Sequence, residues 1–136
     1  MTTTTTANAE DAAVKLLDTV AQGTNFTVSV LDPGTPFDVL ADVEIGENLN
    51  ENVDKHSIRV SIVNVSSATR IALNEVQVPL TPQNNTARRE LLRVPFGALA
   101  NADPGDVIQA IGTYKVTAGV NTDVSIAYGE TFTVGG

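Results

Sequence analysis

The chain has 136 residues, enough for one domain with its own core, and 42% of them are hydrophobic. It contains no cysteine, which excludes disulfides, thiolate nucleophiles and cysteine-containing zinc sites. Sixteen acidic against eight basic residues give a formal charge of −8, which argues against nucleic acid and anionic membrane surfaces as partners.

The N-terminal region begins with a threonine-rich run. Residues 1–7 are low in complexity and carry almost no apolar surface, so we expect a flexible arm there that is disordered unless a neighbour holds it. The run contains neither a basic nor an apolar segment, so we expect no signal peptide. Synthesis in the cytoplasm follows as a prediction.

The next segment has the clearest helical spacing in the chain. Within residues 9–22, apolar side chains recur at the spacing of one helix face, which predicts a short amphipathic helix. The residues of this stripe are Ala13, Leu16, Leu17 and Val20. Residues 1–23 are therefore predicted to form an arm and a helix, separate from a domain over residues 24–136.

From residue 25 onward the hydrophobic period changes to two, which is typical of strands. Alternating segments lie at 26–30, 37–45, 58–62, 71–80, 92–96, 114–120 and 124–128, with turn signals between them. The alternation in 37–45 puts Asp38, Asp42 and Glu44 on a solvent-facing side. About seven short strands at this spacing indicate an all-β fold of sandwich type.

One stretch resembles a known family. Asp103-Pro104-Gly105-Asp106, followed by Gly112-Thr113-Tyr114-Lys115-Val116, is similar to the penultimate strand of immunoglobulin-like domains. The resemblance implies an immunoglobulin-like β-sandwich and a hydrogen bond from Tyr114 to upstream backbone, the tyrosine corner of that family. Ala110 and Val116 depart from the family pattern, which often has Asp and Cys there.

The residues that could carry chemistry are few. His56 is the single histidine and has no second histidine or cysteine as a co-ligand, so a polar position at a strand edge is expected. Asp103 and Asp106 fit a turn better than a calcium loop. No Gly-x-Ser-x-Gly, Ser-x-x-Lys or glycine-rich phosphate motif is present. We therefore expect no enzyme activity, no metal and no cofactor.

Two groups of residues are candidate contacts for a partner protein. The apolar stripe of the predicted helix, Ala13, Leu16, Leu17 and Val20, would bury itself against another subunit. Arg88, Arg89 and Arg93 form a basic cluster, and two interpretations stay open for it. The cluster either protects an edge strand with charge or docks on an acidic neighbour.

These features favour a structural assembly protein. In its size and overall build the chain resembles the small capsid decoration (cement) proteins of tailed phages. That resemblance implies a virion location, a major capsid protein as partner, and a homo-oligomer such as a trimer.

The alternative is an immunoglobulin-like binding or adhesion module for a carbohydrate or protein ligand. Exposed aromatic side chains for sugar stacking are scarce, since most of the few aromatics fall on predicted inward positions.

Overall fold

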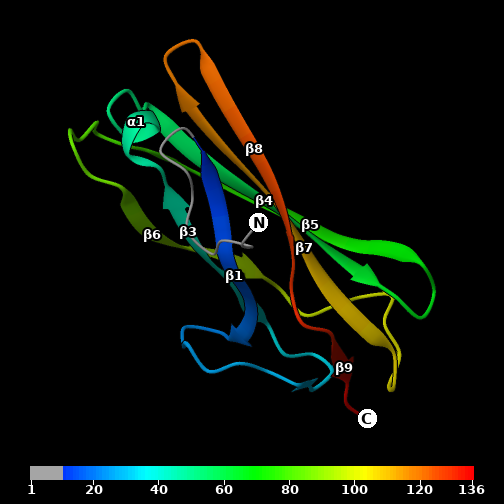
Figure 1. Ribbon diagram of the computed structural model, residues 1–136. Coiled ribbons are helices and arrows are strands. Elements are labelled where there is room, and N and C mark those ends of the chain that lie inside the picture. The colour runs from blue at the N-terminus through cyan, green and yellow to red at the C-terminus, as the bar shows by residue number, and fades with distance from the viewer. Residues whose placement is uncertain (1–10) are drawn as a thin grey trace, which may run out of the picture.

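A computed structural model describes residues 11–136 as two β-sheets packed face to face (Figure 1). The smaller sheet has the order β1-β3-β6, formed by Ala12–Ala21, Phe37–Ile45 and Arg88–Phe96. The arm predicted for residues 1–7 lies outside the described residues.

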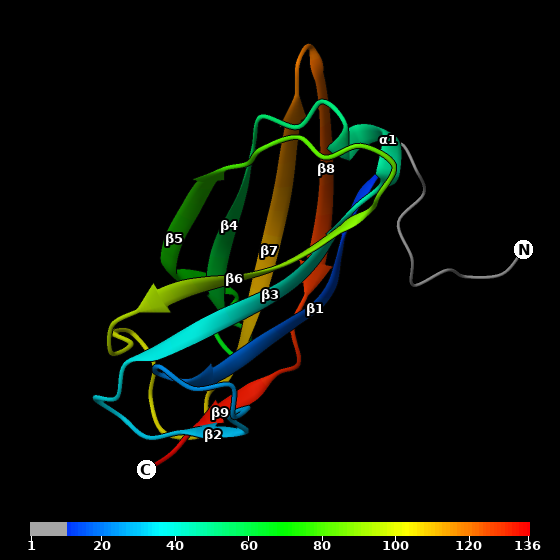
Figure 2. The ribbon, with the colours of Figure 1, turned by 90° about the vertical axis from the view of Figure 1, so that its left-hand side faces the viewer.

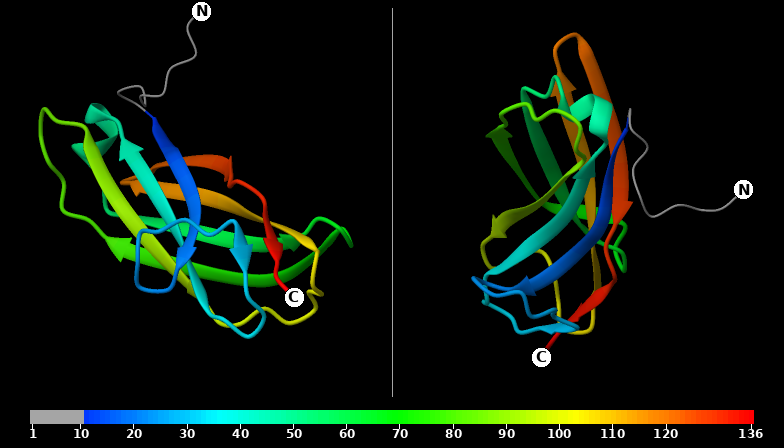
Figure 3. Two further views of the ribbon diagram at one scale, coloured as in Figure 1. Left: turned by 90° about the horizontal axis from the view of Figure 1, so that it is seen from below. Right: turned by 60° about the vertical axis from the view of Figure 1, so that its left-hand side comes forward.

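The larger sheet has the order β2-β9-β7-β4-β5, and β8 also pairs with β7. Its strands are β2 (Val30–Leu31), β4 (Lys55–Asn64), β5 (Thr69–Pro79), β7 (Val107–Ala118), β8 (Asn121–Tyr128) and β9 (Phe132–Val134). The short helix α1 (Glu47–Asn50) lies at the end of the sandwich opposite the C-terminus (Figure 3).

The predicted sandwich is confirmed, and its connections follow the immunoglobulin pattern. The chain crosses from the small sheet to the large one between β3 and β4, and again between β6 and β7 (Figure 2). As a result β4, β7 and β8 share one sheet while β3 and β6 share the other. Strands C, F and G are separated from B and E in the same way in immunoglobulin domains.

The helix predicted within residues 9–22 is wrong, because the chain forms β1 there. β1 pairs antiparallel with β3 from Ala12 opposite Ile45 to Ala21 opposite Phe37, with a register shift between Val14 and Leu16. A β-bulge of this kind places one extra residue in the strand and lengthens one step of the two-residue alternation. The resulting mixed spacing resembles a helix period. The sandwich therefore begins at β1, N-terminal of the boundary predicted at residue 24.

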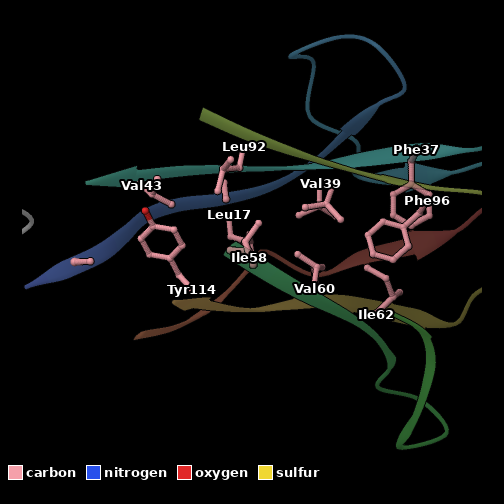
Figure 4. Close-up of a cluster of buried hydrophobic side chains, with 14 of the residues drawn as sticks. Leu17, Phe37, Val39, Val43, Ile58, Val60, Ile62, Leu92, Phe96 and Tyr114 are labelled. Carbon is pink, nitrogen blue, oxygen red and sulfur yellow. The ribbon is translucent and has the colours of Figure 1, made fainter. Parts of the chain in front are cut away.

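The core lies between the two sheets (Figure 4). At one end Phe37 stacks on Phe96 with ring centroids 5.3 Å apart and meets Phe132 edge-on at 6.0 Å. In the middle, Leu17 and Ile58 approach Gly112 so closely that a Cβ atom there would lie 3.2 Å from each side chain. Strand β1 is thus part of the same core as β4 and β7.

Candidate binding face

The apolar stripe predicted to dock on a partner is divided between core and surface. Leu17 and Val20 are only 4% and 1% exposed, and Ala13 is half-buried. Leu16 is the one stripe residue that is mainly exposed, at 59%. The structure therefore removes Leu17 and Val20 from any docking surface, since the folded chain already buries Leu17 in the core and Val20 on the outer side of the small sheet, where it pairs with Thr27.

The three arginines of the predicted basic cluster are all on β6, and each forms an ion pair within the chain. Arg88 contacts Glu90 at 3.2 Å and donates to the Asn50 side chain at 2.9 Å. Arg89 pairs with Asp42 at 2.8 Å on the exposed side of the small sheet. Since their charges are matched locally, these two residues do not form a free basic patch.

Arg93 has the most extensive contacts of the three. It pairs with Asp38 at 2.7 Å and donates to the Thr24 carbonyl and the Asn25 side chain, each at 2.9 Å. Asp38 also accepts the Gly23 amide at 2.9 Å and is only 2% exposed. Arg93 therefore fastens the 23–25 loop to the small sheet.

The solvent-facing side predicted for the 37–45 strand is wrong for two of its three carboxylates. Asp38 is buried beneath Arg93, and Glu44 is buried and pairs with Lys15 at 3.4 Å. Only Asp42 is partly exposed as predicted. The cause is the position of β3 between β1 and β6, whose long cationic side chains cover its outer face.

His56 is buried at 1% exposure, in contrast to the strand-edge position expected for it. Its Nδ1 lies 2.7 Å from the hydroxyl group of Tyr114 on β7. The tyrosine corner implied by the resemblance is thus wrong, because the Tyr114 hydroxyl meets a side chain of the neighbouring strand. Burial lowers the pKa of His56 and raises that of Tyr114, so both groups are held neutral as parts of the core.

Strand β8 turns its large apolar side chains away from the core. Val124, Ile126 and Tyr128 alternate along one face of the strand and are between 54% and 67% exposed. Val120, at the tip of the β7–β8 hairpin, is 99% exposed. We call these four residues the ridge. Strand β8, which carries three of these residues, pairs with β7 along one edge of the large sheet (Figure 2).

The register between β7 and β8 explains why the ridge faces outward. Residues opposite each other in an antiparallel pair point to the same side of the sheet. Ser125 lies opposite the buried Tyr114, and Asp123 lies opposite the buried Val116. The smaller and polar residues of β8 therefore face the interior, and the apolar alternation that normally marks a core face is on the surface.

Beside the ridge, the outer face of β4, β5 and β7 is hollowed into a trough of about 310 Å³. Its lining includes Lys55, Arg59 and Lys115, with Ser57 and Thr113 between them. Glu75 is the single carboxylate of the lining, and it pairs with Arg59 at 3.2 Å. The trough is therefore a cationic region on an acidic protein.

No metal centre emerges from the described part of the chain. Within residues 11–136, no group of three or more histidine or acidic side chains could hold a metal ion. Likewise, none of the helices formed by these residues is long and apolar enough to cross a membrane.

No family model matches the chain, and neither does any curated protein sequence. Among solved structures, the C-terminal domain of wzt is similar, with a TM-score of 0.58 and 9% sequence identity. The match covers 96% of this chain and 76% of that domain. At this level of identity the likeness shows a shared β-sandwich fold.

Two further structures have lower similarity. The major pilin subunit BcpA of Bacillus cereus has a TM-score of 0.49 and 11% identity, over 91% of this chain and 40% of the pilin. A β-glucuronidase of glycoside hydrolase family 2 has a TM-score of 0.44 and 9% identity, over 83% of this chain and 11% of the enzyme. This chain thus corresponds to less than half of either protein.

Proposed function

We propose that this chain is a structural assembly protein whose copies pack against one another through the ridge on β8. The observation that carries the proposal is the outward alternation of Val124, Ile126 and Tyr128 on an ordered strand. Contiguous apolar surface of this kind marks protein interfaces more often than it occurs on free surfaces. No described residue covers the ridge.

Charge supports a second copy of the chain as the occupant. Two chains of net charge −8 repel each other at long range, and this repulsion is smallest where the local surface is not acidic. The four ridge residues carry no charge, and the trough beside them is cationic. A two-fold axis through the ridge brings apolar surface onto apolar surface.

The dimensions of β8 are compatible with such a contact. Its eight residues span about 27 Å at ~3.4 Å per residue. A standard interface buries about 800 Å² on each partner, which corresponds to a patch roughly as wide as β8 is long. Because the contact is isologous, it gives a dimer rather than the trimer implied by the resemblance to capsid decoration proteins.

Sedimentation velocity of the full chain, from about 1 to about 100 µM, tests this proposal. We expect the unmodified chain and a Leu91→Gln control to associate, and Ile126→Gln to remain monomeric. Leu91 is 56% exposed on β6 and Ile126 is 60% exposed, so the two substitutions remove similar apolar surface from different faces. A monomeric unmodified chain, or equal dissociation by both substitutions, would contradict the proposal.

The narrower expectation of a capsid decoration protein has no support from the comparisons and stays a prediction. The same holds for the major capsid partner, the virion location and the absence of enzyme activity. A second candidate function is that of a binding module, which is favoured by the cations and hydroxyl groups that the trough offers to a ligand.

A further inference from the structure

We propose that the trough on β4, β5 and β7 binds an acidic segment of a partner protein. This site borders the ridge, since Lys115 lies opposite Val124, but its binding does not depend on the association of copies of the chain.

The first argument is the distribution of unpaired cations. All eight lysine and arginine residues lie within the described part of the chain, and five of them form ion pairs there. The three without an ion pair among residues 11–136 are Lys55, Arg70 and Lys115. Two of these three line the trough. With three cations and one carboxylate, the trough has a charge of 3 − 1 = +2.

The second argument is the arrangement of these cations. Lys55 lies opposite Thr117, and Ser57 lies opposite Lys115, so the two lysines are diagonal neighbours across β4 and β7. Arg59 is the diagonal neighbour of Lys115 on the other side. Diagonal neighbours are about 7–8 Å apart, within reach of one another's long side chains. The charge of Arg59 is offset by Glu75, but Lys55 and Lys115 have no ion pair among the described residues, and an anionic ligand would remove the repulsion between them.

The third argument concerns the class of ligand. Ser57 and Thr113 place hydroxyl groups between the cations, where they can donate hydrogen bonds to carboxylate oxygens. Sugars are commonly held by stacking on aromatic rings. Among the described residues that line the trough, the one ring belongs to His56, and it is buried. The chemistry therefore favours an acidic peptide over an acidic polysaccharide.

Fluorescence anisotropy with labelled poly-L-glutamate tests the site on the full chain. We expect binding at about 0.05 M salt that weakens at about 0.5 M salt, where surface charges are strongly screened. Lys115→Glu should weaken binding about tenfold, because one attraction is replaced by one repulsion next to two other cations. Circular dichroism melts confirm that each variant keeps the fold.

Arg70→Glu is the matched control. It makes the same change in net charge at the third cation without an ion pair. Arg70 lies opposite Val63 on β4. Measured along β4 at ~3.3 Å per residue, this position is about 13 Å beyond Arg59. We expect it to change binding less than about twofold. Equal weakening by Arg70→Glu, or no binding of poly-L-glutamate at low salt, would overturn the site. Tighter binding of polygalacturonate than of poly-L-glutamate would overturn the choice of a peptide ligand.

The two proposals fail separately. Ile126→Gln should abolish self-association and leave poly-L-glutamate binding intact, whereas Lys55→Glu, on β4 and one strand further from the ridge, should weaken poly-L-glutamate binding and leave self-association intact. Salt also separates them, because it weakens attraction to a polyanion but reduces the repulsion between two acidic chains.

Discussion

Replacing Leu17 by alanine is expected to destabilise the protein by about 2–5 kcal/mol, whereas Leu16→Ala should cost less than about 1 kcal/mol. Leu17 lies in the core against Gly112, and Leu16 is mainly exposed on the same strand. Truncating Leu17 removes apolar contacts and leaves a cavity between the sheets, while truncating Leu16 changes only surface. Urea denaturation of the two variants measures the difference.

This pair of variants also tests the strand assignment of the N-terminal segment. In the amphipathic helix that the spacing predicts, both leucines belong to one apolar stripe, so both substitutions would have similar effects. Equal destabilisation would contradict β1 and restore the helix. The same geometry implies that deleting β1 unfolds the sandwich, since its core loses one of its three strands on the small sheet.

Replacing Arg93 by alanine is expected to destabilise the fold by about 3 kcal/mol. The substitution leaves the carboxylate of Asp38 buried with the Gly23 amide as its one remaining donor among those described. It also frees the loop at Thr24 and Asn25, which Arg93 holds through two further hydrogen bonds. An unpaired buried charge is the dominant cost.

Arg89→Ala is the control for Arg93→Ala. Its ion pair with Asp42 lies on the surface, where solvent screens the attraction, so we expect no measurable change in stability. Both arginines belong to the basic cluster that the sequence marks as a candidate docking site. A loss of stability from Arg89→Ala as large as that from Arg93→Ala would refute the distinction between a buried and an exposed pair.

The sequence predicts the strands of this fold better than it predicts their faces. Alternation identifies Val124, Ile126 and Tyr128 as one side of a strand, but a period of two leaves open which side is inward. The answer lies in the pairing of β8 with β7, where Ser125 lies opposite the buried Tyr114 and Val124 lies opposite the exposed Lys115. That pairing is a tertiary fact, so the ridge could not be found by pattern alone.

The helix prediction failed for a related reason. The apparent helix stripe combines both faces of β1, because Leu17 lies opposite Ala41 on the core side whereas Leu16 and Val20 lie opposite Asp42 and Asp38 on the outer side. The bulge between Val14 and Leu16 adds a step of three to this pattern. His56 shows the same limit for single polar residues, since its burial depends on a hydroxyl partner 58 positions further along the chain. The inward side of β3 was predicted correctly, because its alternating apolar residues are all buried and its pairing with β6 runs without a register shift.

A cysteine cross-link tests the ridge as a contact between copies most directly. The chain has no cysteine of its own, so a single introduced thiol reports one position without ambiguity. Two sheet faces that pack against each other lie about 10 Å apart, so a bis-maleimide of about that length, rather than a direct disulfide, joins the central residues of two ridges across a two-fold axis. Ile126→Cys should therefore give a covalent dimer with this reagent, and Leu91→Cys, at similar exposure on β6, should stay monomeric. No dimer from Ile126→Cys, or equal yields from both positions, would contradict the assembly role of the ridge.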